Sequence, residues 1–267
     1  MSHEDSVTDE SLRLTSSKVY QIIAVEGQEE LERPLFSLGW SGLVAGLCIT
    51  FSLFCEGYMR HHLPEGNFFL VENIGYTFGF IIVIIGRLQL FTENTITVVI
   101  PLLERRSVRN FIRTCKLWLT VLTTNFIGTF IVALLVTKFN LLPDDLLATC
   151  IEISVEAVDK PFMSVFTTGI PAGFLIACLV WMLPSSRRGG NEFWIILMMT
   201  YIIAIGDFSH IVAGSVEAFI LWLEGMISLQ QTLGYLLGAC LGNIVGGTFL
   251  FTMMAYNQVK GERYKSS

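Results

Sequence analysis

Four stretches of this chain contain no charged residue, and each is long enough to cross a lipid bilayer. They span residues 34–55, 117–137, 161–186 and 225–259, with lengths of 22, 21, 26 and 35 residues. A helix of about 20 apolar residues crosses the ~30 Å hydrocarbon core of a membrane. Only 15% of the chain is charged, whereas a soluble domain carries roughly 25%. The runs therefore predict an all-α integral membrane protein.

Two further apolar stretches are interrupted by charged or titratable residues. They cover residues 73–103 and 193–223. Arg87 and Glu93 break the first stretch. Asp207 and His210 break the second one. We therefore expect six transmembrane helices, of which the second and the fifth are broken.

Lys and Arg are distributed unequally over the segments that connect these helices. If the N-terminus is cytoplasmic, 13 of them lie on the inner side and 3 on the outer side, with Arg87 left within the membrane. Such a bias predicts that both termini face the cytoplasm. Residues 138–160 form an acidic loop, which we expect on the outer side.

The chain divides into three predicted parts. Residues 1–34 begin acidic and have no apolar core of a signal peptide, so they form a cytoplasmic N-terminal segment. This segment contains either an amphipathic helix on the membrane surface before Pro34 or a partly ordered tail. Residues 35–258 are the predicted six-helix transmembrane channel domain, and residues 259–267 are a cytoplasmic tail.

Short patterns recur between the two halves of the chain. Asn125-Phe-Ile-Gly128 returns as Asn243-Ile-Val-Gly246, 118 residues later, and Thr92 and His210 are separated by the same 118 residues. The first and fourth crossings also share the pattern Gly-x-x-Ala-Gly, at 42–46 and 169–173. Because each unit has three crossings, the second unit must be inverted in the membrane. Paired broken helices in such inverted repeats point to a transport site near the midplane.

The charges in the breaks need a physical explanation. An Arg or Asp at the centre of a bilayer costs about 2.5–3.5 kcal/mol on the insertion scale, so these residues must line a cavity, pair with one another or face water. For Arg87 two interpretations stay open, a structural salt bridge to Glu93 or Asp207 and a place along the transport path. For His210 we favour function, because its side chain alone here can change charge near neutral pH.

The motifs at the two breaks resemble those of the formate/nitrite transporter family. Leu90-Phe91-Thr92 is similar to the family's omega-loop signature, and residues 208–213, Phe-Ser-His-Ile-Val-Ala, are similar to its histidine motif. The resemblance covers residues 18 to 258. The stretches 72–80, 89–94 and 210–217 look closest to the YfdC-like inner-membrane branch.

The resemblance implies a fold and a function. The fold is an aquaporin-like protomer assembled as a homopentamer with one pore in each protomer. The function is passage of small monovalent anions such as formate or nitrite across the bacterial inner membrane, with membrane lipid as the surrounding partner. It involves neither an enzymatic reaction nor a cofactor.

The resemblance also implies roles for particular residues. Thr92 faces His210 across the pore, and Lys160 lies at the outer entrance, where it draws anions in. The hydrophobic constriction is formed by Leu90, Phe91 and Ile203. Since an anion cannot cross a dry constriction cheaply, we expect a proton from His210 or its hydrogen-bonded water to convert it into a neutral acid.

This sequence departs from the family pattern near both breaks. Arg87-Leu-Gln89 precedes the Leu-Phe-Thr motif, where small or acidic residues are usual, and Gly214 replaces a common Asn. Asp207 adds an acid three residues before His210. An additional cation beside the constriction either favours anions or is neutralised by Asp207.

The sequence fits other classes of protein less well. A neutral-solute channel shares the inverted repeat but carries paired Asn-Pro-Ala boxes, which this sequence lacks. A membrane enzyme needs a nucleophile or metal motif, and neither HExxH nor GxSxG is present. The six cysteines lack metal-ligand spacing, and a net charge of -6 excludes nucleic-acid binding. A membrane protein of the same fold without an open anion pore stays a further alternative.

Overall fold

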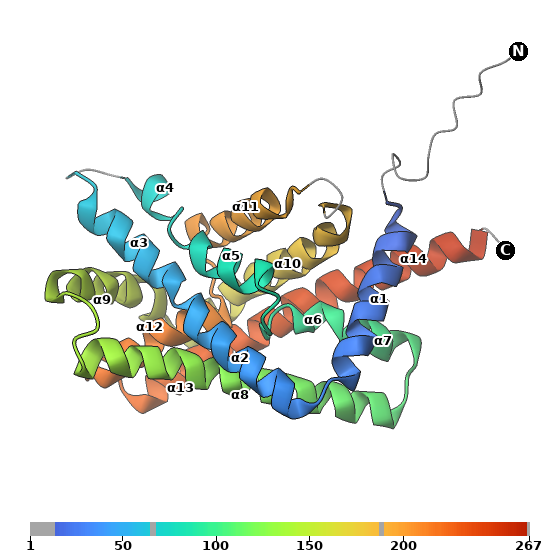
Figure 1. Ribbon diagram of the computed structural model, residues 1–267, viewed down its shortest axis with the longest axis horizontal. Coiled ribbons are helices and arrows are strands. Elements are labelled where there is room, and N and C mark those ends of the chain that lie inside the picture. The colour runs from blue at the N-terminus through green and yellow to red at the C-terminus, as the bar shows by residue number, and fades with distance from the viewer. Residues whose placement is uncertain (1–13, 65–67, 187–189, 266–267) are drawn as a thin grey trace, which may run out of the picture.

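The computed structural model describes residues 14–64, 68–186 and 190–265, and its regular secondary structure there is entirely helical (Figure 1). Residues 1–13 of the predicted N-terminal segment and the inner-side Arg187 and Arg188 lie outside the described residues. In chain order the elements are α1 Ser16–Glu32, α2 Leu35–Ile49, α3 Phe51–His62, α4 Phe69–Glu72, α5 Thr77–Ile85, α6 Asn94–Thr97, α7 Val99–Glu104, α8 Val108–Lys138, α9 Asp144–Val158, α10 Phe162–Ser186, α11 Glu192–Ile205, α12 Ile211–Leu223, α13 Leu229–Ile244, the π-helical η2 Val245–Thr252 and α14 Met253–Lys265.

Four helical segments are long and apolar enough to cross a membrane. They are Leu35–His62, Val108–Lys138, Phe162–Ser186 and Leu229–Gly261. Large apolar side chains such as Trp40, Leu119 and Leu237 are exposed on their outer faces. An exposed apolar surface of this extent fits contact with lipid or with another subunit. Each of the four continuous uncharged runs of the sequence overlaps one of these segments.

The two broken segments end their first helices in the same way. After α5 and α11 come Gly86 and Gly206, followed by Arg87 and Asp207 with positive φ angles of 52° and 51°. The amide of the residue after each positive φ donates to a carbonyl five residues back, at 3.0 Å in both breaks. This is the Schellman ending of a helix, with Arg or Asp where Gly is usual.

These hydrogen bonds relate the two breaks by an offset of 120 residues rather than 118. Gly86 corresponds to Gly206, and Leu90 therefore corresponds to His210. Thr92 is thus not the counterpart of His210, although the 118-residue spacing predicted that it was. The offset differs because the 118-residue spacing belongs to Asn125 and Asn243, which lie on other helices.

Glycines allow two helix pairs to pack at very short distances. A Cβ atom at Gly46 of α2 would collide with the backbone of Asn125 on α8. A Cβ at Gly173 of α10 would collide in the same way with the backbone of Asn243 on α13. Small residues at membrane-helix contacts serve this close approach. The recurring glycine patterns of the sequence therefore mark two very close helix contacts.

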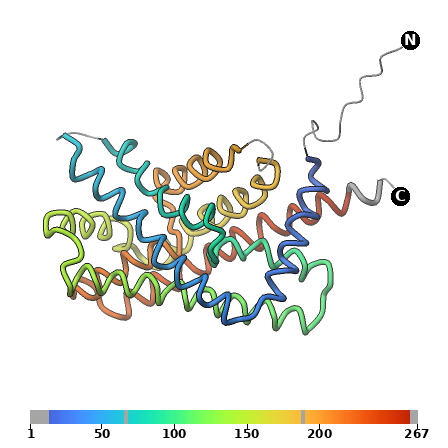
Figure 2. Tube along the Cα trace, viewed as in Figure 1, coloured from blue at the N-terminus to red at the C-terminus, as the bar shows by residue number. Residues whose placement is uncertain are grey.

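Different elements gather at the two ends of the molecule. At one end α1 packs against α6, α7, α10 and α14, and at the other end α3 packs against α4 and α9 (Figures 1 and 2). α1 begins at an N-cap, Thr15, whose hydroxyl accepts a hydrogen bond from Lys18 N. Its buried residues Val19, Ile23 and Gly27 repeat at four-residue spacing, which places one face of α1 against the other helices.

Candidate functional site

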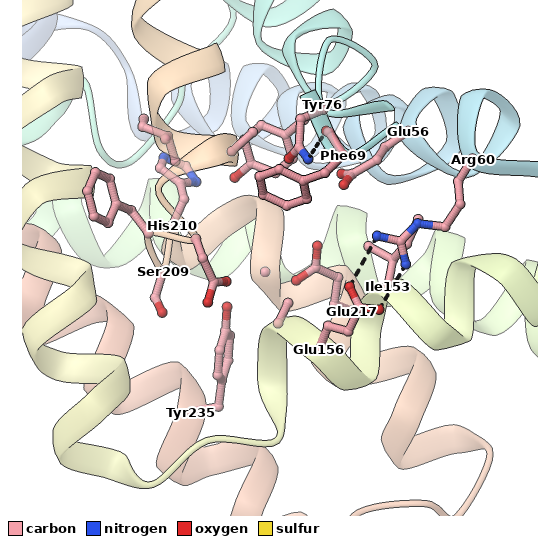
Figure 3. A pocket seen from close by; sticks show the side chains of 17 residues that line it. Glu56, Arg60, Phe69, Tyr76, Ile153, Glu156, Ser209, His210, Glu217 and Tyr235 are labelled. Atoms are coloured by element: carbon pink, nitrogen blue, oxygen red, sulfur yellow. Dashed lines mark hydrogen bonds and ion pairs between the residues drawn. The ribbon is translucent and has the colours of Figure 1, made fainter. Parts of the chain in front are cut away.

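Two cavities approach the breaks of the helices. The first, called here the Glu217 cavity, has a volume of about 350 Å³ and lies among Glu56, Arg60, Tyr76, His210, Glu217 and Tyr235 (Figure 3). The second, called the Glu93 cavity, has a volume of about 320 Å³ and lies among Glu26, Glu30, Arg87, Gln89, Glu93 and Ile196. α1 contributes to the second cavity through its two glutamates.

His210 and Thr92 meet between the two breaks. His210 Nε2 lies 2.8 Å from Thr92 Oγ1, and both side chains are fully buried. His210 is the N-cap of α12, because its Nδ1 accepts a hydrogen bond from Ala213 N at 3.2 Å. With Nδ1 acting as the acceptor, the proton of the neutral ring is on Nε2, which donates to Thr92. Phe80 packs edge-on against this ring, with centroids 4.9 Å apart.

Two buried asparagines fix the backbone of the breaks. Asn125 Nδ2 donates to Gln89 O at 2.9 Å, and its Oδ1 accepts from Phe91 N at 3.0 Å. Asn125 Nδ2 also donates to Gly42 O at 2.8 Å. Backbone groups at membrane depth need such partners because water is absent there. The sequence showed that this residue recurs, but it did not reveal this role.

Asn243 repeats this arrangement at the second break. Its Nδ2 donates to Ser209 O and Gly169 O, both at 2.8 Å, and its Oδ1 accepts from Ile211 N at 2.9 Å. The two partners in the break flank His210, just as the partners of Asn125 flank Leu90. Each asparagine therefore clamps the residues on both sides of one central position.

The three predicted constriction residues are all buried. Ile203 contributes to the wall of the Glu217 cavity, whereas Leu90 and Phe91 belong to neither cavity wall. Phe91 packs edge-on against Trp118 at 5.7 Å between centroids. Their role as a constriction stays a prediction.

Arg87 does not form the salt bridge that the sequence suggested. Its guanidinium lies 3.6 Å from Glu26 of α1, and its side chain is 76% exposed. Within the described residues, no ion pair joins it to Glu93 or Asp207. For Asp207 the reason is placement, because Arg87 lines the Glu93 cavity whereas Asp207 lines the Glu217 cavity. Asp207 therefore cannot neutralise Arg87.

Lys160 is paired with Asp207. Its Nζ donates to Oδ1 and Oδ2 of Asp207 at 2.5 and 2.6 Å. Lys160 lies in a neighbouring cavity that shares Tyr235 with the Glu217 cavity. The structure thus brings the predicted entrance lysine close to the second break, but with its charge balanced by a carboxylate.

Carboxylates outnumber Lys and Arg side chains in the walls of both cavities. The Glu217 cavity carries Glu56, Glu156, Asp207 and Glu217 with Arg60. The Glu93 cavity carries Glu26, Glu30, Glu93 and Glu192 with Arg87. On α1, outside the apolar spans, burial raises the pKa of Glu30 above its usual range more than the adjacent Arg33 lowers it.

Sequence reasoning missed the glutamates of the Glu217 cavity. Glu217 lies within the apolar helix α12, and this isolated acid was the available signal. Glu56 directly follows an uncharged run, and a charged residue at that place indicates the end of a membrane helix. Arg60 also escaped notice, although it bridges Glu72 at 2.7 Å and Glu156 at 3.1 Å.

Comparison with known proteins places these features in context. The family described as formate/nitrite transporter matches residues 17–257. The inner membrane protein YfdC of Escherichia coli strain K12 is 36% identical over 259 residues, which cover 96% of this chain and 83% of that protein.

Two solved structures have a similar fold. An FNT family ion channel superimposes with a TM-score of 0.77 at 18% identity, covering 91% of this chain and 98% of that one. A pentameric formate channel with formate bound gives a TM-score of 0.72 at 19% identity, covering 85% and 97%. At these identities the likeness concerns the fold.

Proposed function

This chain belongs to the formate/nitrite transporter family, and from that premise we propose that it carries small monovalent anions through a pore in each protomer. One observation carries the proposal: the buried bond between Thr92 and His210, 2.8 Å long, lies where the two broken helices meet. The formate bound in a channel of similar fold supports the class of substrate.

The proposal includes an arrangement in the membrane. The chain crosses the bacterial inner membrane six times as two inverted three-helix repeats, with both termini cytoplasmic. The matched Schellman endings and the matched roles of Asn125 and Asn243 support the repeat. The inner-membrane relative supports the location, and the pentameric channel supports assembly as a homopentamer.

Proton balance follows from the hydrogen bonds of His210. If Nε2 gives its proton to an anion such as formate, Nδ1 must take up a proton from solvent that reaches the Glu217 cavity, because the ring would otherwise become an anion. That uptake breaks the bond from Ala213 N, and loss of such an N-cap costs about 0.5–2 kcal/mol. The neutral acid then passes the buried apolar residues without the desolvation cost of an ion. Transport is therefore coupled to the protonation of the His210 ring, and that protonation disturbs the N-cap of α12.

The test is flux into proteoliposomes with formate, nitrite and larger monovalent anions at several pH values. We expect His210→Asn to flatten the pH dependence of formate flux and to lower the maximal rate at least tenfold, since Asn cannot exchange a proton. His62→Asn, which removes an exposed imidazole, is the matched control. An unchanged rate and pH profile in folded His210→Asn would overturn the proton exchange at His210.

A further inference from the structure

Two glutamates in the Glu217 cavity lack the partners that buried charges normally have. Glu56 is 6% exposed and Glu217 is 4% exposed. Within the described residues, neither carboxylate accepts a hydrogen bond or has a Lys, Arg or His nitrogen within 4 Å. Buried carboxylates are ordinarily paired or bound to a cation. The ionised form of either side chain therefore needs a partner from outside the chain.

Both carboxylates face the same space. Glu56 reaches into the cavity from α3 and Glu217 from α12, while Tyr235 enters from α13 (Figure 3). Gly214 makes this arrangement possible, because a Cβ atom there would collide with the Tyr235 hydroxyl. The cavity at about 350 Å³ is large enough for a small molecule between these oxygens.

The basic residues around the cavity do not supply the missing charge. Arg60 is held by Glu72 and Glu156 at 2.7 and 3.1 Å. Lys160 is held by Asp207. With each base already bound to other carboxylates, any charge that Glu56 and Glu217 carry is negative and unbalanced within the cavity. A site of that charge attracts cations and repels anions.

The other side chains favour an organic cation over a metal ion. In the part of the chain that the structure describes, no group of three or more His, Cys, Asp or Glu side chains is arranged to hold a metal ion. The wall instead presents the aromatic side chains of Phe69, Tyr76 and Phe208. Aromatic faces attract ammonium groups, and carboxylates accept their N–H donors.

We propose that the Glu217 cavity binds a small protonated amine, with Glu56 and Glu217 as its counter-charges. This site goes beyond the proposed anion transport, since it is a second ligand site of opposite charge on the path to His210. The bound amine neutralises the cavity, so an anion meets less repulsion on its way to the break.

The test is binding of methylammonium to the purified full-length protein in detergent, measured by calorimetry and by thermal unfolding at constant ionic strength. We expect methylammonium chloride to raise the unfolding temperature more than sodium chloride does, because a ligand of the folded state stabilises it. Glu217→Gln should weaken methylammonium binding at least tenfold, and Glu56→Gln should weaken it in the same direction.

Glu152→Gln is the matched control, since it removes one exposed acid from α9 outside the cavity and should leave binding unchanged. Equal effects of methylammonium and sodium, or equal binding by wild type and both cavity variants, would overturn the proposal. The first result would mean that protons alone neutralise the two glutamates, and the second that methylammonium binds at another place. Formate flux in vesicles from the same preparation tests the proposed transport separately.

Discussion

The two breaks of this protein share a backbone but differ in their side chains. Both follow a Schellman ending, both have a residue with φ near 51° and both are clamped by an asparagine. The central clamped residue is Leu90 in one break and His210 in the other. The comparison teaches that the hydrogen bonds that hold the backbone are duplicated, whereas an imidazole stands at the central position of one break only.

The charged residues at the two breaks also occupy equivalent backbone positions but differ in their side chains. The residues with positive φ are Arg87 and Asp207, which have opposite charges and different partners. Arg87 pairs with Glu26 on the N-terminal helix, and Asp207 pairs with Lys160 just before α10. Each break is therefore tied by an ion pair to a different neighbouring element, at equivalent places on the backbone.

The largest expected effect comes from removing a clamp. Asn125→Ala and Asn243→Ala each leave three buried backbone groups without their side-chain partner. Unsatisfied groups cost roughly 1–3 kcal/mol each, less where a carbonyl keeps another bond, so we expect about 2–5 kcal/mol of lost stability. Unfolding in mixed micelles measures this loss. If the supports are equivalent, the two variants agree within about 1 kcal/mol, and a larger gap would show that one clamp dominates.

A smaller loss of stability should distinguish the two breaks. Ser41 Oγ accepts a hydrogen bond from the backbone N–H of Gln89 at 3.1 Å, whereas Thr168 Oγ1 bonds the Ser209 hydroxyl at 2.8 Å. Ser41→Ala orphans a backbone donor and should cost about 1–3 kcal/mol. Thr168→Val removes a bond between side chains and should cost about 0.5–1.5 kcal/mol. The same unfolding assay compares them, and the reverse order would contradict this distinction.

The smallest effect concerns the positive φ positions. Glycine relieves a left-handed conformation that costs other residues about 1–2 kcal/mol, and an exposed ion pair contributes about 0–1 kcal/mol. We therefore expect Arg87→Gly to leave stability unchanged or about 1 kcal/mol higher. Asp207→Gly should be the less stable of the two, because it leaves the half-buried Lys160 unpaired. Thermal unfolding of both variants checks this order, which equal stabilities would refute.

Much of the fold could be predicted from the sequence, because a helix that crosses a membrane requires a long run of uncharged residues. The four continuous spans and the places of both breaks follow from charge spacing alone. The resemblance implied that Thr92 faces His210 across a pore, and in the structure the two side chains lie 2.8 Å apart. The offset of 118 residues described the asparagines correctly but was two residues short for the breaks.

Partners of charged residues could not be predicted. One of the two interpretations left open for Arg87 was a salt bridge to Glu93 or Asp207, but α1 supplies Glu26 from a segment that is far away in sequence. The acidic cavities also depend on the packing of several helices, so Glu56 and Glu217 line the same cavity although 161 positions separate them. Long-range contacts of this kind are absent from local patterns of charge and hydropathy.

The π-helical η2 gives the last crossing a feature that α8 lacks. At η2 the hydroxyl of Thr248 donates to Thr95 O at 2.7 Å, and Gly247 leaves room for the Thr95 side chain. This contact joins the first half of the chain to the second. A protein engineered by fusing two copies of the first half would lose that junction, so duplication alone cannot rebuild this molecule. Any symmetric redesign must also include the π-helical segment η2.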